Sequence, residues 1–227
     1  MWSYYGSKSK VVNYYPDPIY GRIIEPFAGS GRYSLKWYER MVHLNDINPV
    51  IFNLWNYVIN TSTVEMIENL PELKYQDYIK DVEGLLQVER DLMGYFACRG
   101  VATPAKRVSS WSASGNEIRR GKDRILYYKP KIQHWELTSV DYRELPNVEA
   151  TWFIDPPYQH NIGKYVYNDM NYEELAEWCK SRKGQVIVCE NDKADWLDFR
   201  YLAEYRGSKR NSVEVIWTNN FASKNKE

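Results

Sequence analysis

Residues 22–31 read RIIEPFAGSG, an apolar segment that leads directly into a proline and a glycine-containing turn. The run Arg22-Ile23-Ile24-Glu25 predicts a short buried strand, and residues 34–41 after the turn predict a helix. Glycines directly after a strand let the backbone turn tightly and approach a ligand closely. The N-terminus of the following helix presents N–H groups that have no partner inside the helix. The segment therefore predicts a strand–turn–helix unit with a ligand-binding loop.

The same alternation of strand and helix recurs along the chain. Further helices are predicted at residues 49–59 and 172–181. Further strands are predicted at residues 41–44, 151–154, 185–189 and 213–217. Strands that alternate with helices indicate an α/β fold with a largely parallel sheet.

The stretch from residue 61 to residue 131 interrupts this alternation. It contains an acidic helical segment at about residues 81–96 and a loop rich in Ser, Gly and basic residues at 109–122. A chain of 227 residues with 44% hydrophobic residues is long enough for one sizeable core and a modest insertion. We therefore expect a small, mainly helical subdomain at 61–131, inserted into an α/β domain formed by 1–60 and 132–227.

Charge is balanced over the whole chain, with 30 basic and 30 acidic residues, but it is unevenly distributed. Between residues 99 and 131, nine basic residues stand against Glu117 and Asp123. Such a block is equally typical of a phosphate-contacting surface and of a solvated loop. The basic residues are Arg99, Lys106, Arg107, Arg119, Arg120, Lys122, Arg124, Lys129 and Lys131.

Several protein classes are disfavoured by the composition. The three cysteines, Cys98, Cys179 and Cys189, are widely spaced and form no metal-binding pair, which indicates free thiols in a reducing compartment. The N-terminal residues contain no apolar signal region, and no stretch approaches the roughly 20 apolar residues of a membrane span. We expect a soluble, cytoplasmic protein with no metal and no membrane partner.

An acidic residue closes the second predicted strand. Asp46 stands about 20 residues after Glu25, where a carboxylate accepts both hydroxyls of a ribose in nucleotide-binding α/β folds. An ordinary turn with a helix-capping Asp gives the same pattern. The third glycine of a dinucleotide fingerprint is absent, which disfavours a nicotinamide-dependent enzyme.

The tetrapeptide Asp155-Pro156-Pro157-Tyr158 follows the apolar strand at 151–154. Two consecutive prolines fix the backbone and remove two N–H donors. The tetrapeptide falls at the carboxyl edge of the sheet, where active sites of α/β proteins lie. The Asp155 carboxylate and the Pro156 carbonyl can each accept one N–H, and Tyr158 can stack on a ring. The set predicts a site for a planar ring that bears an amino group.

These motifs resemble, in kind and in order, those of the DNA adenine-N6 methyltransferases of the alpha group, which include the GATC-methylating enzymes. The resemblance covers most of the chain. Residues 4–8 (YYGSK) resemble the N-terminal cofactor motif, residues 25–31 the methionine-binding loop, and residues 45–48 the ribose-binding strand end. The pair Asp141-Tyr142 resembles the residues that contact the cofactor's adenine, and residues 155–158 the catalytic motif.

The resemblance implies a Rossmann-like class I methyltransferase sheet, mostly parallel and mixed at one edge. It also implies transfer of a methyl group from S-adenosylmethionine to N6 of an adenine flipped out of double-stranded DNA. The implied catalytic residues are Asp155, Pro156, Pro157 and Tyr158. The implied cofactor-binding residues are Tyr5, Gly6, Lys8, Glu25, Pro26, Phe27, Ala28, Gly29, Ser30, Gly31, Asp46, Ile47, Asp141, Tyr142 and Asp155. The implied DNA-binding residues are Arg99, Lys106, Arg107, Arg119, Arg120, Lys122 and Arg124.

Other functions stay open from the sequence alone. The chain could methylate N4 of cytosine or adenine in RNA, be a catalytically silent module that binds S-adenosylmethionine and DNA, or be a nucleotide-dependent oxidoreductase. The N4-cytosine enzymes more often carry Ser where Asp155 stands, and the intact tetrapeptide argues against a silent module. The expected setting is the cytoplasm of a bacterial or phage-infected cell. The sequence does not predict the oligomeric state, and it is compatible with a monomer acting on DNA. The insertion is short and does not match the target-reading segment of the GATC enzymes, so the recognised sequence is not predicted.

Overall fold

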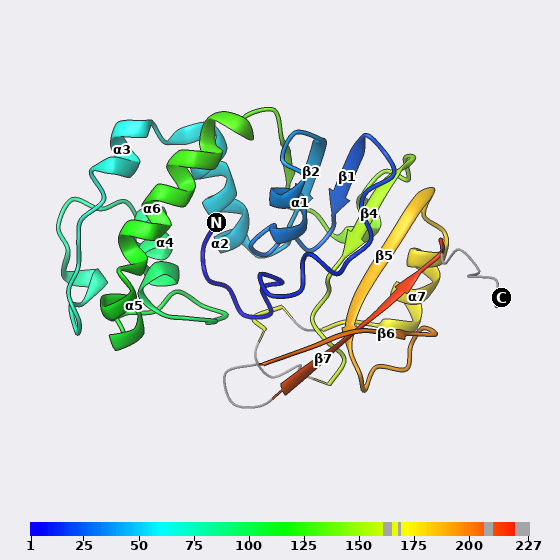
Figure 1. Ribbon diagram of the computed structural model, residues 1–227. Coiled ribbons are helices and arrows are strands. Elements are labelled where there is room, and N and C mark those ends of the chain that lie inside the picture. Colours follow the sequence, from blue (N-terminus) through cyan, green and yellow to red (C-terminus); the bar gives the residue numbers. More distant parts are fainter. Residues whose placement is uncertain (161–164, 168, 207–210, 221–227) are drawn as a thin grey trace.

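Seven strands form a single sheet in the computed structural model, which describes residues 1–160, 165–167, 169–206 and 211–220 (Figure 1). Their order across the sheet is β3-β2-β1-β4-β5-β7-β6, and only β7 runs antiparallel to its neighbours β5 and β6. The strands are β1 (Arg22–Glu25), β2 (Met41–Asn45), β3 (Glu136–Thr138), β4 (Ala150–Ile154), β5 (Gly184–Asn191), β6 (Arg200–Arg206) and β7 (Asn211–Thr218). The predicted Rossmann-like α/β sheet, mostly parallel and mixed at one edge, is confirmed.

Successive side chains of a strand point to opposite faces of the sheet. In this sheet both faces are buried, each in its own apolar core. Ile23 of β1 and Phe153 of β4 join a core with helices α1 (Arg32–Lys36) and α2 (Pro49–Asn56). Their chain neighbours Ile24 and Trp152 join a second core with helix α7 (Tyr172–Lys180). Strands covered on both faces read as continuous apolar runs, as β4 and β5 do.

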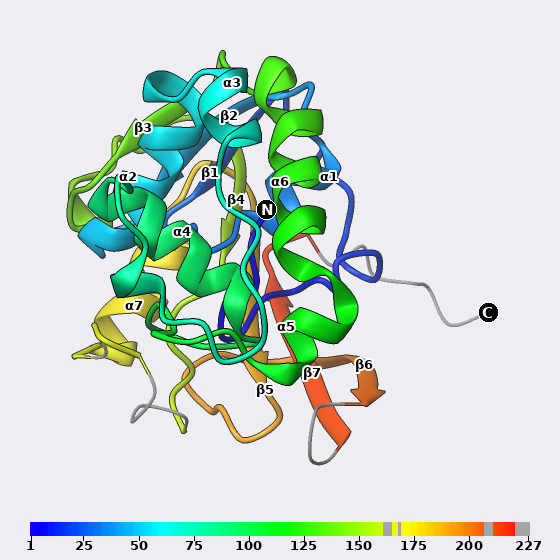
Figure 2. The ribbon, with the colours of Figure 1, turned by 90° about the vertical axis from the view of Figure 1, so that its left-hand side faces the viewer.

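Helices fill the stretch between β2 and β3 and stand beside the sheet (Figure 1). Helix α6 packs against α3, α4 and α5, and Figure 2 shows it lying along the face turned toward the viewer. These helices are α3 (Val64–Glu68), α4 (Gln87–Ala97), α5 (Ser110–Gly115) and α6 (Glu117–Tyr128). Short helical turns also occur at Tyr57–Thr61, Ile79–Asp81, Lys129–Lys131 and Tyr142–Glu144.

The prediction of a loop at residues 109–122 is wrong, because this stretch forms α5 and the first half of α6. Asn116, with φ 52°, separates the two helices in the left-handed conformation that Asn tolerates better than most residues. Ile118, Gly121 and Ile125 recur at helical spacing and are all buried in α6. The serines and basic residues concealed this periodicity. The mainly helical character expected for 61–131 is confirmed.

Several predicted element boundaries also differ from the observed ones. The helix expected at 34–41 is shorter, because α1 ends at Lys36 and the chain must turn before β2 begins at Met41. The acidic helix expected at about 81–96 begins at Gln87 instead. Strands β3 and β6 were not predicted, since β3 has three residues and β6 is largely exposed.

The proposed division at residues 60/61 and 131/132 stays a prediction. One continuous buried cluster joins Ile23 and Phe153 of the sheet to Ile67, Leu92 and Ile125 of the inserted helices. The N-terminal segment lies between the two parts (Figure 1), where the Arg124 side chain donates a hydrogen bond to the Met1 carbonyl at 3.0 Å. No helix within the described residues is long and apolar enough to span a membrane.

Candidate active site

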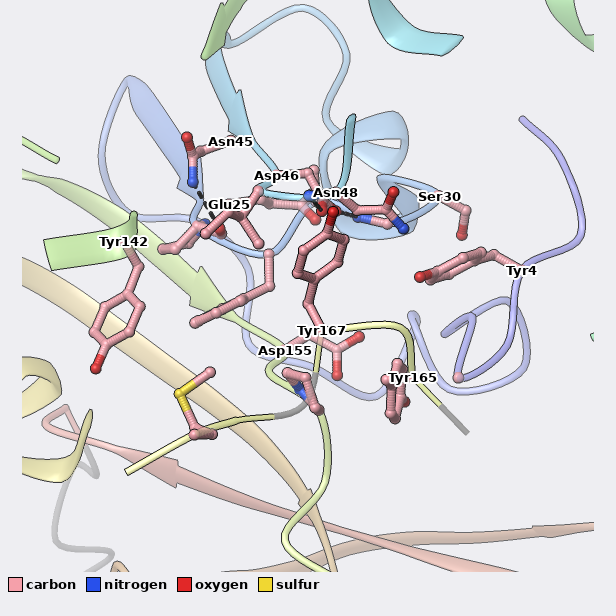
Figure 3. Close-up of a pocket in the computed structure, with 18 of the residues that line it drawn as sticks. Tyr4, Glu25, Ser30, Asn45, Asp46, Asn48, Tyr142, Asp155, Tyr165 and Tyr167 are labelled. Atoms are coloured by element: carbon pink, nitrogen blue, oxygen red, sulfur yellow. Dashed lines mark hydrogen bonds between the residues drawn. The ribbon is translucent and has the colours of Figure 1, made fainter. Parts of the chain in front are cut away.

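A cavity of about 570 Å³ opens at the carboxyl ends of the parallel strands. Strands β1 and β4 are neighbours, but the chain proceeds from β1 toward β2 on one side and from β4 toward β5 on the other. Ligands of open α/β sheets bind at such a reversal of strand order. Glu25 ends β1, Asp46 follows β2 and Asp155 follows β4, and all three line this cavity (Figure 3).

The turn between β1 and α1 is fixed by conformation and by hydrogen bonds. Gly31 directly precedes α1 and has φ 57°, and a Cβ atom there would lie 2.7 Å from the Trp55 ring. The Asp46 carboxylate accepts the N–H of Gly29 at 2.9 Å and of Asn48 at 3.0 Å, which ties the turn to the end of β2. Burial raises the pKa of Asp46 to about 6, although these two hydrogen bonds oppose the shift. The loop therefore presents backbone groups and a carboxylate to the cavity.

Glu25 is a second carboxylate in the cavity and is buried, with only 2% of its surface exposed. It accepts the N–H of Ser34 in α1 at 2.8 Å. Burial raises the pKa of Glu25 to about 8, because the charged form is poorly solvated there. A cationic ligand group beside Glu25 would favour its ionised form.

An aromatic wall closes one side of the cavity. The rings of Phe27 and Tyr142 have centroids 5.4 Å apart, and both residues line the cavity. Asp141 begins the helical turn that carries Tyr142 and pairs with Arg143 at 2.7 Å, a contact that lowers the pKa of Asp141. Asn45 holds this region to the sheet by donating to the carbonyls of Pro26 and Val140, each at 3.0 Å. Apolar rings above a polar strand edge suit a planar heterocycle.

The N-terminal segment closes the opposite side. Gly6 has φ 75°, and a Cβ atom there would lie 2.7 Å from the Tyr165 hydroxyl oxygen. The Ser7 hydroxyl accepts from Arg32 at 3.2 Å and from Ser30 at 3.0 Å. The hydroxyl therefore joins the N-terminal segment to the turn after β1.

Lys8 carries a buried ammonium group that contacts the catalytic candidate. Its side chain is 5% exposed, and its Nζ lies 2.7 Å from Asp155 Oδ1 and 3.5 Å from Glu214 Oε1. Burial alone would lower the pKa of Lys8, but the two carboxylates raise it well above its ordinary value. Burial raises the pKa of Asp155 to about 6, with Lys8 lowering it and Glu214 raising it. Asp155 is therefore mainly ionised at neutral pH.

The remaining members of the predicted catalytic tetrapeptide lie partly behind the cavity. Pro157 lines it and accepts a hydrogen bond from the Tyr172 hydroxyl at 2.7 Å. Pro156 and Tyr158 are buried and do not belong to the lining. The Tyr158 hydroxyl donates to Glu214 at 2.6 Å and contacts Lys8. The stacking role expected of Tyr158 stays a prediction.

The structure brings all predicted cofactor-binding residues together around one cavity. It also adds residues that the motifs did not single out. Tyr165 and Tyr167 come from the segment after the catalytic motif and lie beside Tyr4 and Asp155 in Figure 3. In the sequence, the only sign that this segment contributes to the site is that tyrosines follow the catalytic motif closely. Further additions are Val140, Asp169, Met170, Asn171 and Glu174.

The predicted DNA-binding residues lie on the insertion, outside the cavity lining. Arg99, Lys106, Arg107 and Arg119 are exposed, and the Arg107 guanidinium stacks 3.8 Å from the centre of the Tyr78 ring. Arg120 is exposed but pairs with Glu117 at 3.1 Å. Two others make contacts inside the protein: Lys122 donates to the Leu70 carbonyl at 2.7 Å, and Arg124 donates to the Met1 carbonyl. No cluster of three His, Cys, Asp or Glu residues suited to a metal ion is found in the described part of the chain.

The chain resembles solved structures titled "Putative methyltransferase yhhF from Escherichia coli" (TM-score 0.38, 10% identity, 92% of this chain and 78% of that chain) and "putative methylase HI0767 from Haemophilus influenzae" (TM-score 0.34, 12% identity, 86% and 77%). A comparison with curated protein sequences gives no match. Residues 4–151 match the family model for the D12 class N6 adenine-specific DNA methyltransferase. The chain therefore belongs to the family of D12 class N6 adenine-specific DNA methyltransferases.

Proposed function

We propose that this protein transfers a methyl group from S-adenosylmethionine to N6 of an adenine in double-stranded DNA. The observation that carries the proposal is the position of Asp155, a carboxylate followed by two prolines at the cavity edge and held by Lys8 at 2.7 Å. The match to the family model ends at residue 151 and does not reach Asp155, so the geometry at Asp155 supports the proposal independently of the matched residues.

The cavity suits S-adenosylmethionine in size and in the chemistry of its lining. A volume of about 570 Å³ is typical of sites for small ligands and cofactors. Each carboxylate oxygen has more than one acceptor position, so Asp46 can accept ribose hydroxyls in addition to its two backbone N–H groups. Phe27 and Tyr142 offer faces to an adenine ring, and Glu25 offers a carboxylate to the ammonium group of the methionine part. When bound, S-adenosylmethionine supplies a methyl group on a positively charged sulfur.

Asp155 can activate the adenine that receives the methyl group. The lone pair of the adenine amino group is delocalised into the ring, which makes the amino nitrogen a weak nucleophile. An ionised carboxylate that accepts one N–H would favour a pyramidal nitrogen with a localised lone pair. The Pro156 carbonyl is the proposed second acceptor, although Pro156 does not belong to the cavity lining. Lys8 holds Asp155 Oδ1 in place. The orientation of the carboxylate toward the adenine amino group would then account for much of the acceleration of methyl transfer. Methylation releases one proton from the amino group, and Asp155 is the adjacent base that can accept it.

An adenine inside a duplex cannot reach this cavity, so we propose that the base is flipped out of the helix. The exposed basic residues of the insertion would contact phosphates and hold the duplex beside the cavity. They are Arg99, Lys106, Arg107 and Arg119.

The substrate is tested with labelled S-adenosylmethionine and four acceptors. These are double-stranded DNA, RNA of the same sequence, and oligonucleotides that contain adenine without cytosine or cytosine without adenine. Label in adenine of double-stranded DNA is the predicted result. Label only in cytosine or only in RNA would replace the proposal by one of those activities. Tight S-adenosylmethionine binding without transfer to any acceptor would indicate a silent binding module.

A further inference from the structure

A buried carboxylate on the last strand lies against the catalytic motif. Glu214 belongs to β7, where it pairs with Asn191 of β5 and Ala203 of β6. Only 1% of its surface is exposed. It lies outside residues 4–151, which match the family model, and it does not line the cavity. A charged group is rarely buried unless it is paired and hydrogen-bonded, so its partners indicate its role.

Two partners of the Glu214 carboxylate, Lys8 and Tyr158, belong to the surroundings of Asp155. Its Oε1 accepts the hydroxyl of Tyr158 at 2.6 Å and of Tyr15 at 2.5 Å, and lies 3.5 Å from Lys8 Nζ. Lys8 also contacts the Tyr158 hydroxyl, and its Nζ lies 4.3 Å from the centre of that ring. The Lys8 ammonium thus lies between two carboxylates, Asp155 and Glu214, and Tyr158 connects to both Lys8 and Glu214.

We propose that Glu214 is a positioning residue, which fixes Lys8 and Tyr158 against Asp155 and orients the catalytic carboxylate for the methylated base. The inference rests on the proposed function, because it assigns a role within the same site. Glu214 itself would not touch the cofactor or the base. Without it, the Lys8 ammonium would have one carboxylate partner instead of two, and the Tyr158 hydroxyl would lose its acceptor.

The charge of Glu214 also acts on Asp155. Both carboxylates contact the same ammonium, at 2.7 Å and 3.5 Å, so they lie within about 6 Å of each other. A like charge at this range raises the pKa of Asp155, and Lys8 lowers it. The other titratable groups near Asp155 come from every neighbouring element: Tyr4, Tyr15, Glu25, Tyr158, Tyr165, Cys189, Glu190 and Tyr205. None of these residues is itself replaced in Glu214→Gln, which removes one charge and keeps an oxygen that can accept from Tyr15 and Tyr158.

The test compares wild type, Glu214→Gln, Glu214→Asp and the control Glu204→Gln on neighbouring β6, whose carboxylate is exposed and accepts from Asn211. Glu214→Gln should lower kcat by about tenfold or more, because the carboxylate that orients attack is less well held. Its dissociation constant for S-adenosylmethionine should stay within about twofold, since Glu214 does not line the cavity. The acidic limb of its pH–rate profile should move down by about half a unit to one unit. Glu214→Asp should return the acidic limb to its wild-type position. Glu204→Gln should have the kcat and the pH–rate profile of wild type.

A carbon-13 NMR titration measures the pKa of the Asp155 carboxyl directly, without enzyme turnover. The Asp155 signal is assigned as the one that is missing in Asp155→Asn. A midpoint that falls in Glu214→Gln supports the inference, whereas an unchanged midpoint overturns it. The inference is also overturned if kcat of Glu214→Gln falls only in proportion to the fraction of folded protein and the acidic limb of its pH–rate profile stays where it is in wild type. If the midpoint falls but wild type transfers no methyl group to any DNA, the proposed function fails while the contact between Glu214 and Asp155 stands.

Discussion

Asp155 must be ionised to accept an N–H from adenine, and burial raises the pKa of Asp155 to about 6. We therefore expect kcat to be constant above this pH and to fall by about tenfold per pH unit below it. The profile is measured between pH 5 and 8, with circular dichroism to verify that the protein stays folded. A rate that does not change from pH 5 to 8 would contradict the assignment of Asp155 as the acceptor.

Glu25 should release a proton when the cofactor binds. Burial raises the pKa of Glu25 to about 8, so the side chain is mainly protonated at pH 6.5. A cationic ligand in the cavity favours the ionised form and lowers this pKa, and its affinity should therefore increase as the pH rises toward 8. Calorimetry at pH 6.5 in buffers of different ionisation enthalpy measures the proton.

The matched variant for this measurement is Glu25→Gln, which has no proton to release at this position. The apparent binding enthalpy of wild type should depend on the buffer, and that of Glu25→Gln should depend on it much less. Equal buffer dependence in the two proteins would show that the proton comes from another group.

The turn between β1 and α1 requires glycine at residue 31, which has φ 57° and faces the Trp55 ring. Gly31→Ala should lower the free energy of unfolding by about 1–3 kcal/mol, because a side chain in this conformation is strained. It should also weaken S-adenosylmethionine binding, since the turn lines the cavity. Thermal unfolding and calorimetry measure the two effects.

Gly21→Ala is the control for this substitution. Gly21 lies just before β1, and a Cβ atom there would have no neighbour within 4 Å. Its stability should change by less than about 1 kcal/mol. If the two alanine variants were equally stable and bound the cofactor equally well, the turn would not have the role described here.

Helix α6 carries basic residues with different environments, and these should have different roles. Arg119 is exposed, whereas the Lys122 side chain is 12% exposed and contacts Leu70 and Glu72. Arg119→Ala should weaken DNA binding and reduce the slope of log affinity against log salt by about 0.9, as expected for one lost phosphate contact. Lys122→Ala should instead lower the melting temperature. The account of α6 fails if Arg119→Ala binds DNA with the affinity and salt slope of wild type.

The central strands could be predicted because each is a run of apolar residues buried on both faces, as in Thr151-Trp152-Phe153-Ile154. Strand β6 could not, because alternate side chains such as Tyr201, which is 67% exposed, face solvent at the edge of the sheet. The helices at 110–128 were concealed by serine and basic residues, whose composition indicates a loop. Composition was less informative there than the spacing of Ile118, Gly121 and Ile125.

The candidate site was largely predictable, because the ends of parallel strands meet at one edge and each strand end carries its own motif. Glu25, Asp46 and Asp155 are brought together for this reason. The contact of Lys8 with Glu214 could not be predicted, since the two residues come from opposite ends of the chain and no local pattern connects them. Such pairs depend on the antiparallel placement of β7, which only the folded sheet shows.

The whole molecule combines a cofactor-sized cavity, a half-buried Asp155 at its edge and an insertion that carries exposed basic residues. The most direct test of this account measures N6-methyladenine by nucleoside analysis after unmethylated DNA is incubated with S-adenosylmethionine and the protein. Wild type is compared with Asp155→Asn and with Asp17→Asn, whose carboxylate is exposed before β1 and pairs with Lys36. We predict N6-methyladenine from wild type and Asp17→Asn and almost none from folded, cofactor-binding Asp155→Asn. Equal N6-methyladenine from Asp155→Asn, or no methylated base from wild type, would contradict the account.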